Sequence, residues 1–205
     1  MLKKYFKNVI KPQNNFSGKL MVSMMNKGHK KLSLWGMKFL EINPDDIGID
    51  LGCGGGMNIK EQLKKAKKVY GLDYSEVSVQ KTKELNSKEI LNNRCEVFQG
   101  NVLNIPLPDN TCDYATAFET VYFWTDIIAA FKEVKRILKA GGKFLIVNEI
   151  CDPKKGEYWI KTIDLRIYED FELEEILNLA GFKNIEINVD KKSSNIAIVS
   201  EKLEE

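Results

Sequence analysis

The order of strand-like and helical segments predicts an α/β protein with a doubly wound, mostly parallel sheet. Short apolar segments alternate with helical segments along most of the chain, as in sheets whose parallel strands are joined by helical crossovers. A glycine-rich turn follows the first apolar segment, as ligand-binding turns do in such sheets. The last two apolar segments are separated by a short polar loop, which predicts a C-terminal antiparallel hairpin.

An N-terminal helical cap is expected at residues 1–45, followed by one compact ligand-binding domain at residues 46–205. Apolar residues recur every three or four positions over residues 21–39, which indicates one face of a helix. Gly28 and Gly36 weaken a continuous helix, so a bend is expected within this segment. We expect the cap to fold over the binding site and to close on the substrate.

The first half of the domain is expected to contain four strands and two helices. The turn at residues 43–46, which contains proline and two aspartates, precedes the first strand. Ser75 is suited to begin the second helix, because its hydroxyl accepts a hydrogen bond from an amide of the first turn. A proline-rich turn at residues 106–110 separates the last two strands. We expect strands at 47–51, 68–72, 94–99 and 111–118, and helices at 57–66 and from Ser75 to about Asn92.

The second half is expected to contain three strands and two helices. Apolar residues at helical spacing follow Asp126, and Gly141-Gly142 is expected to end this helix. Gly181 is expected to end the next helix. The loop at residues 190–194 is too short for a parallel crossover, so the strands on either side of it are antiparallel. We expect strands at 143–149, 182–189 and 195–200, and helices at 127–138 and 171–180.

Charge is unevenly distributed, although the 205-residue chain carries a formal net charge of only +2. Residues 1–40 contain nine lysines and no acidic residue. The remainder holds 22 of the 31 basic residues and all 29 acidic residues, a net charge of −7. The lysine-rich part is either a solvated helical face or a surface that attracts an anionic substrate.

The cysteines and the single histidine bear on metal binding and on the cellular compartment. Four scattered cysteines without a C-x-x-C pair, together with His29 alone, argue against a zinc site and a disulfide framework. We therefore expect no metal ion and a reducing, cytoplasmic location. No apolar segment approaches the roughly 18 residues that a membrane-spanning helix needs, so no membrane association is expected.

The segment from Ile47 to Gly56 predicts a small-molecule site. It is an apolar strand that ends in Asp50 and Leu51 and then turns through several glycines. Glycine adopts positive φ angles and lets the backbone approach a ligand closely. The helix that follows offers unpaired amide groups at its N-terminus. The backbone of this turn is therefore expected to hold the ligand.

Polar residues also follow the other strands, at the edge where open α/β sheets bind ligands. Asp73 lies 19 residues beyond Gly54, where a carboxylate accepts hydrogen bonds from both hydroxyls of a ribose; otherwise it is an acidic turn residue before Ser75. Asn101 either pairs with an adenine edge through its amide or holds a turn. The polar residues that follow the fourth and fifth strands are Glu119, Asn148 and Glu149.

A dinucleotide cofactor is the main alternative ligand for the glycine turn. Its pattern is G-x-G-x-x-G, whereas Met57 stands here where the last glycine falls. Asp50 would place a negative charge beside a pyrophosphate, but it suits a ligand with a positive ammonium group. The turn therefore favours a ligand with a ribose and an ammonium group over a nicotinamide cofactor.

Four motifs follow one another in the chain at Ile49–Gly56, Val69–Ser75, Ile105–Asp113 and Glu133–Gly142. Each motif alone is weak, whereas four motifs in the right order are specific. With them, residues 47–149, roughly half of the chain, resemble the class I S-adenosylmethionine-dependent methyltransferase family. The family is known for a Rossmann-like sheet of seven strands, one of them antiparallel, and the expected C-terminal hairpin agrees with it.

The resemblance implies S-adenosyl-L-methionine as the cofactor and S-adenosyl-L-homocysteine as its product. It places Asp50 at the methionine part of the cofactor, Asp73 at the ribose hydroxyls and Tyr74 against the adenine. The further positions that it implies are Gly52, Cys53 and Gly54 at the methionine part, Asn101 and Val102 at the adenine, and Phe118 and Glu119 beside the methyl group.

Methyl transfer from a sulfonium is an in-line displacement, so positioning of the acceptor supplies much of the rate. A base is needed only where the acceptor must lose a proton. The candidates are Glu119, Tyr122 and His29, although Glu119 is alternatively a cap of the next segment and His29 a surface residue. The aromatic residues expected near the pocket are Trp35, Tyr122, Phe123, Trp124 and Trp159.

We therefore expect a methyltransferase that acts on a small-molecule substrate. An RNA or protein methyltransferase is the alternative within the same fold. A nicotinamide-dependent oxidoreductase and a non-catalytic cofactor-binding sensor are alternatives from other classes. No base-stacking motif is visible, which argues against a nucleic-acid partner. The sequence predicts neither the methyl acceptor nor the oligomeric state.

Overall fold

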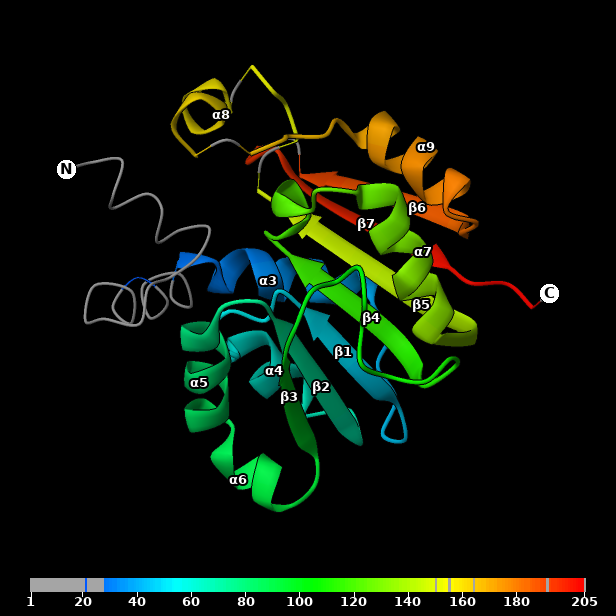
Figure 1. Ribbon diagram of the computed structural model, residues 1–205. Coiled ribbons are helices and arrows are strands. Elements are labelled where there is room, and N and C mark those ends of the chain that lie inside the picture. Colours follow the sequence, from blue (N-terminus) through cyan, green and yellow to red (C-terminus); the bar gives the residue numbers. More distant parts are fainter. Residues whose placement is uncertain are drawn as a thin grey trace.

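The computed structural model contains a seven-stranded sheet of order β3-β2-β1-β4-β5-β7-β6 (Figure 1). It describes residues 21, 28–149, 151–154, 156–163, 165–190 and 192–204. Strand β7 runs antiparallel to both of its neighbours, and the other pairings are parallel, which confirms the predicted fold class. The strands are β1 Ile47–Leu51, β2 Lys68–Asp73, β3 Cys95–Gln99, β4 Cys112–Phe118, β5 Leu138–Asn148, β6 Lys183–Asp190 and β7 Asn195–Glu201.

Helices cover both faces of this sheet (Figure 1). Strand β5 shows why: Phe144 and Ile146 point to one hydrophobic core and Leu145 and Val147 to the other, because side chains alternate along a strand. Helices α7 and α9 pack on the first face, and α3, α4 and α5 pack on the second. The helices are α3 Lys30–Gly36, α4 Met57–Gln62, α5 Glu76–Leu85, α6 Ser87–Leu91, α7 Ile127–Ile137, α8 Glu157–Ile163 and α9 Asp170–Leu179, with 3₁₀ turns η1 Met37–Phe39 and η2 Val121–Phe123.

The described end of the expected cap is attached to the sheet. Leu32 and Leu40 are buried in the second core, together with Val147 of β5. A Cβ at Gly36 would lie 2.4 Å from Val147 Cγ2, so only glycine lets α3 approach the sheet so closely. Residues 1–20 and 22–27 lie outside the described part of the chain. The domain boundary at residue 45 stays a prediction.

One helix expected from Ser75 to about Asn92 is instead two, α5 and α6, which corrects the prediction. The expected N-cap is present, since the Ser75 hydroxyl accepts a hydrogen bond from the Ser78 amide at 3.4 Å. The break falls at Asn86, whose side-chain amide donates to the carbonyl oxygens of Thr82 at 3.0 Å and Gly56 at 3.1 Å. Asn86 thus leaves the helix in order to hold the glycine turn.

The glycine pair Gly141-Gly142 does not end a helix, which is a second correction. Helix α7 ends at Ile137, and β5 begins at the next residue and runs through both glycines. Gly141 has a φ of 74°, and the register of β4 against β5 shifts beside this point, so the glycines form an irregularity within the strand. Helix α8 was not expected, and α4 ends at Gln62, four residues earlier than predicted.

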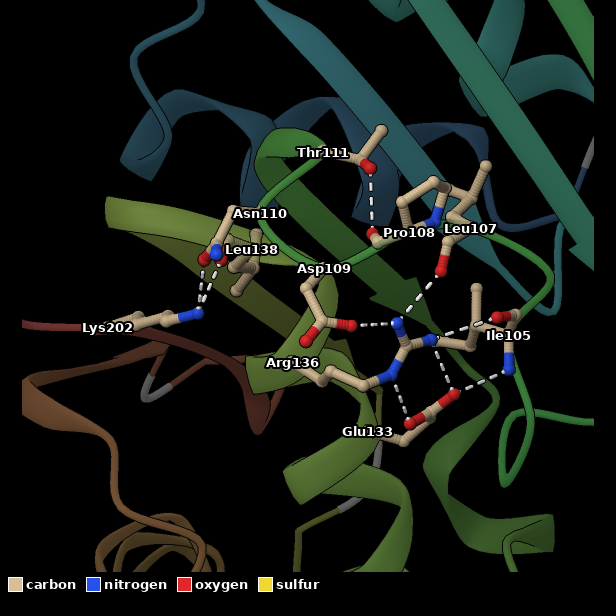
Figure 2. A network of polar contacts seen from close by, with 10 residues as sticks. All are labelled: Ile105, Leu107, Pro108, Asp109, Asn110, Thr111, Glu133, Arg136, Leu138 and Lys202. Carbon is tan, nitrogen blue, oxygen red and sulfur yellow. Dashed lines mark hydrogen bonds and ion pairs between the residues drawn. The ribbon is translucent and has the colours of Figure 1, made fainter.

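Two of the sequence motifs meet where β4 begins (Figure 2). The guanidinium of Arg136 in α7 donates to both carboxylate oxygens of Glu133 at 2.8 Å and to Asp109 Oδ1 at 2.6 Å. It also donates to the carbonyl oxygens of Leu107 at 2.9 Å and Ile105 at 3.0 Å. These contacts fasten the loop before β4 to α7, so we assign this part of the family pattern to the fold rather than to ligand binding.

Candidate functional site

A cavity of about 340 Å³ lies at the carboxyl ends of β1, β2 and β4, where open α/β sheets bind their ligands. Its wall combines the glycine turn, the ends of these strands and the start of α3. The lining residues are His29, Ser33, Gly52, Cys53, Gly54, Gly55, Met57, Asn58, Leu72, Asp73, Tyr74, Ser78, Gly100, Asn101, Val102, Leu103, Phe118, Glu119, Thr120, Phe123, Trp124 and Thr125.

The glycine turn has the backbone conformation that its sequence predicts. Gly52, Gly54 and Gly56 have φ angles of 71°, 53° and 78°, in the left-handed region that favours glycine. A Cβ at Gly52 would lie 2.2 Å from the hydroxyl oxygen of Thr120, so the turn also packs tightly against the segment after β4. From the opposite side the Thr82 hydroxyl donates to the Gly54 carbonyl oxygen at 2.8 Å. These contacts fix the turn without a ligand.

Asp73 lies on the cavity wall at the end of β2 and is only 8% exposed. Its two carboxylate oxygens accept hydrogen bonds from the Gly54 amide at 2.9 Å and the Ser75 amide at 2.8 Å. Burial raises the pKa of Asp73 to about 6, although these amide hydrogen bonds act in the opposite direction. The Ser78 side chain also forms a hydrogen bond to this carboxylate, which keeps an acceptor position for a ligand hydroxyl.

Asp50, by contrast, does not lie on the cavity wall and is 1% exposed. Its Oδ1 atom accepts a hydrogen bond from the Thr116 hydroxyl at 2.7 Å, and its Oδ2 atom is buried without a hydrogen-bond partner. Burial raises the pKa of Asp50 to about 7. In this arrangement Asp50 does not line the cavity, whereas the sequence analysis expected it at the methionine part of the cofactor.

The residues expected at an adenine lie together on the wall. Tyr74 is 40% exposed, and Val102 lies beside Asn101. The Asn101 side-chain oxygen accepts a hydrogen bond from the Leu103 amide at 3.0 Å. Asn101 therefore holds a turn, as one of its two interpretations predicts, and its amide nitrogen remains available to a ligand.

His29 and Glu119 meet on the wall beside Phe118, although 90 residues separate them in the chain. His29 Nδ1 lies 3.8 Å from Glu119 Oε2, and the other Glu119 oxygen accepts hydrogen bonds from the Tyr122 hydroxyl at 3.3 Å and from the Glu149 amide. Burial raises the pKa of Glu119 to about 8 and lowers the pKa of His29. Near neutral pH, His29 is thus an uncharged base beside a carboxyl group that holds its proton.

Glu149 is the third residue of a group with His29 and Glu119, and the sequence analysis did not predict that these three residues lie together. One potential ligand atom each from His29, Glu119 and Glu149 lies within 4.8 Å of the others. The position of Glu149 directly after a strand was the available signal, but sequence reasoning could not show that the end of β5 faces the start of α3. Thr120 and Ser33 are further wall residues that the sequence analysis missed.

The expected aromatic residues divide into two groups. Phe123 and Trp124 lie on the wall. Tyr122 is 8% exposed and reaches the site only through its hydrogen bond to Glu119, and Trp35 packs edge-on against Phe39 away from the wall. The Trp159 side chain lies outside the described part of the structure.

The charge of the wall is one-sided. Among the residues described, the lining set includes Asp73 and Glu119 but no lysine or arginine. The lysines of residues 1–40 that the structure describes therefore do not give this cavity a positive surface. No described helix is long and apolar enough to span a membrane. All four cysteines are free thiols.

The sequence and the fold are similar to those of known methyltransferases. A family model described as a methyltransferase domain matches residues 49–146. Demethylmenaquinone methyltransferase from Staphylococcus carnosus (strain TM300) is 26% identical, over 74% of this chain and 73% of that protein. The methyltransferase YdaC of Bacillus subtilis (strain 168), itself uncharacterized, is 25% identical over 80% and 86%. A SAM-dependent methyltransferase from Aquifex aeolicus has the same fold, with a TM-score of 0.73 and 20% identity over 89% of this chain and 97% of that one. Residues 49–146 thus match a methyltransferase domain, and the chain is similar in sequence and in fold to S-adenosylmethionine-dependent methyltransferases.

Proposed function

We propose that the cavity binds S-adenosyl-L-methionine together with a small molecule that accepts the methyl group. The observation that carries this proposal is the single cavity that the glycine turn and Asp73 share with Glu119 and His29. One side offers groups for a ribose and a backbone-bound ligand, and the other offers groups that can hold and move a proton. Two ligands in one cavity are what a transfer reaction requires.

The residues of the glycine side fit S-adenosyl-L-methionine. Gly54 leaves open space where a side chain would stand, so the turn can approach the methionine part closely. Asp73 has free acceptor positions for the ribose hydroxyls, and Tyr74 offers an exposed ring for the adenine. Asp50 would favour the ammonium group through its charge. The further residues proposed at the cofactor are Gly52, Cys53, Asn101, Val102 and Phe118.

The remaining side of the cavity would position the acceptor. S-adenosyl-L-methionine supplies an activated methyl group when bound. Phe123 and Trp124 would exclude water and orient an apolar part of the acceptor. His29 is the proposed base, since burial keeps its imidazole uncharged and its Nδ1 atom lies 3.8 Å from Glu119 Oε2 on the cavity wall. Tyr122 is a positioning residue for Glu119.

The relatives support an acceptor of low molecular weight. Demethylmenaquinone methyltransferase and cycloartenol-C-24-methyltransferase, which is 28% identical over 58% of this chain, are named for small molecules. A wall without lysine or arginine, among the residues described, also disfavours an RNA substrate, because the phosphate backbone requires cations. The free thiols support a reducing, cytoplasmic compartment.

We further propose that residues 1–45 act as a cap that closes on the ligands. The support is that His29 and Ser33 already reach the cavity wall from this segment. Closure predicts that amide hydrogen exchange in α3 slows when both ligands are bound. Exchange that is the same with and without ligands would contradict it.

Calorimetry with S-adenosyl-L-homocysteine tests the cofactor assignment directly. We expect binding of this product and none of NAD, with a higher unfolding temperature in its presence. Asp73→Asn removes the charge that strengthens the hydrogen bonds to the ribose, so affinity should fall by about ten- to a hundredfold. The exposed Asp45→Asn variant is the matched control and should bind normally.

Three results would contradict the assignment. Tight binding of NAD would favour the oxidoreductase alternative. Unchanged affinity in Asp73→Asn would remove this residue from the ribose. Binding of the cofactor without turnover on any acceptor would favour the non-catalytic sensor.

A further inference from the structure

The acceptor side of the cavity carries acidic groups, and the described residues around it supply no lysine or arginine. Glu119 and Glu149 lie within 4.8 Å of each other and of His29. Within the described ranges, neither group forms an ion pair with a lysine or arginine. Glu119 is desolvated, and burial makes it hold its proton, whereas Glu149 is exposed. A positive ligand beside them would favour the ionised form of Glu119 and would pair with both acidic groups.

Glu119 is also held in one orientation. Its backbone has a φ of 57°, which is uncommon for a residue with a side chain. The Tyr122 hydroxyl and the Glu149 amide donate to Oε1, so Oε2 is the oxygen left to face His29 and a ligand. Aromatic rings of Phe123 and Trp124 stand on the same wall, and such rings attract cations as well as apolar groups.

We propose that the methyl acceptor is an amine that enters the cavity as an ammonium ion, held by Glu119 and Glu149. This inference rests on the proposed methyl transfer and names the class of its second substrate. An acceptor that must react as an anion, such as a phenolate or an enolate, would be disfavoured beside these two acidic groups at the moment of attack. An amine is positive before the reaction and positive again after it, so the same carboxylates favour substrate and product.

Protons and electrons balance in this methyl transfer, and His29 is the only protein residue that the step needs. The ammonium group gives one proton to the unprotonated imidazole of His29, which frees the nitrogen lone pair. That lone pair forms the new nitrogen–carbon bond to the methyl group, while the carbon–sulfur bond of the sulfonium breaks and its electrons remain on sulfur. The products are a methylated ammonium ion, S-adenosyl-L-homocysteine and a protonated His29, which returns its proton to solvent.

A matched pair of acceptors provides the test. The full-length protein is given S-adenosyl-L-methionine and either 2-phenylethylamine or 2-phenylethanol, which differ only in the reacting group, and methylated product is measured by mass. Further pairs replace the phenyl group with larger and smaller apolar groups. We expect methylation of amines and none of the paired alcohols. Methylation of the alcohols but not the amines would overturn the proposal.

Glu149→Gln tests the role of the carboxylates. Glu149 is exposed, so the change should not affect folding, and we expect the kcat/KM for the amine to fall by about tenfold or more. Affinity for S-adenosyl-L-homocysteine should not change, and the exposed Glu186→Gln variant on β6 should behave as the wild type in both measurements. A loss of S-adenosyl-L-homocysteine affinity in Glu149→Gln would assign the carboxylates to the cofactor instead.

Two further results separate this inference from its alternatives. If removal of metal ions with a chelator abolishes activity and Mn²⁺ restores it, the three side chains hold a metal ion and the ammonium assignment is wrong. If calorimetry shows no binding of S-adenosyl-L-homocysteine, the proposed function itself fails. Binding of the product with no amine methylated in any pair leaves the function standing but overturns the acceptor class.

Discussion

The Arg136 cluster and the His29 cluster use charge in opposite ways. Arg136 of α7, beside the start of β4, donates to two carboxylates and two carbonyl oxygens, so its charge is compensated (Figure 2). At the opposite ends of β4 and β5, Glu119 lies on the cavity wall beside Glu149 and an uncharged histidine, and no described lysine or arginine pairs with it. Compensated charges hold a fold together, whereas uncompensated ones cost stability and are retained where a ligand completes them.

The largest effect on folding should come from Arg136→Ala. The change leaves Glu133, which is 15% exposed, and two loop carbonyls without their main donor. We expect the free energy of unfolding to fall by about 3 kcal/mol, because a part-buried ion pair and two hydrogen bonds to loop carbonyl groups are lost together. Urea unfolding measures it, with Lys60→Ala on the surface as control. If Arg136→Ala unfolds at the wild-type urea concentration, the network does not stabilise the fold.

Glu119→Gln should lower turnover strongly and stability little, whereas Arg136→Ala should lower stability strongly. Glutamine keeps an oxygen that can accept from Tyr122 and the Glu149 amide but cannot ionise when a positive ligand binds, so the free energy of unfolding at pH 7 should stay within about 1 kcal/mol of wild type. Turnover should fall by about a hundredfold, equivalent to about 2.7 kcal/mol of activation free energy. Steady-state kinetics and urea unfolding of the same preparation test both parts. Unchanged turnover, or a loss of stability as large as in Arg136→Ala, would place Glu119 with the structural charges.

Asp50 extends the comparison to a buried carboxyl with one unpaired oxygen. Its pKa of about 7 in the folded protein lies above the usual value of 3.8, so the folded state holds the proton more tightly than the unfolded chain. The associated stability is fully present below pH 4 and is lost as the pH rises through 7. We expect wild type to lose on the order of 2 kcal/mol between pH 5 and pH 8 from this residue.

The control for that effect is Asp50→Asn, which cannot titrate. The free energy of unfolding of the variant should depend less on pH over the same interval, and thermal unfolding at several pH values measures the difference. The pKa of Asp73 is also raised, and its charge raises that of Asp50, so the difference between the two proteins reports on Asp50 together with its interaction with Asp73. If the free energy of unfolding depends on pH in the same way in both proteins, Asp50 does not change its protonation in this range.

The smallest effect should follow Lys202→Met at the edge of the Arg136 region. Lys202 Nζ donates to Asn110 Oδ1 at 2.8 Å and to the Leu138 carbonyl oxygen at 2.7 Å, both near the surface (Figure 2). Exposed charged contacts contribute little, so we expect a loss of about 0.5 kcal/mol. High-salt and low-salt unfolding should give nearly the same value. A loss near that of Arg136→Ala would mean that the two parts of the network are coupled.

Local sequence signals predicted much of the fold and part of the site. The alternating pattern located all seven strands, because strand and helix periods are local properties of the chain. The glycine turn and Asp73 were found for the same reason, since the turn needs residues without a Cβ and the ligand-facing acid follows a strand. The errors occurred where a tertiary contact overrides a local preference. Asn86 breaks a helix to hold Gly56, and Gly141 and Gly142 serve an irregular strand pairing instead of a helix end.

By itself the sequence determined the doubly wound sheet, the glycine turn and the family, since these depend on periodicity and on residues close together in the chain. Only the tertiary structure placed His29 beside Glu119 and Glu149, drawn from three segments far apart in sequence. It also decided that Asp50 lies off the cavity wall and that the described wall has no lysine or arginine despite the lysine-rich N-terminal sequence. The physical reason is that the charge, burial and pKa of a site depend on which segments meet in space, and no local pattern records that.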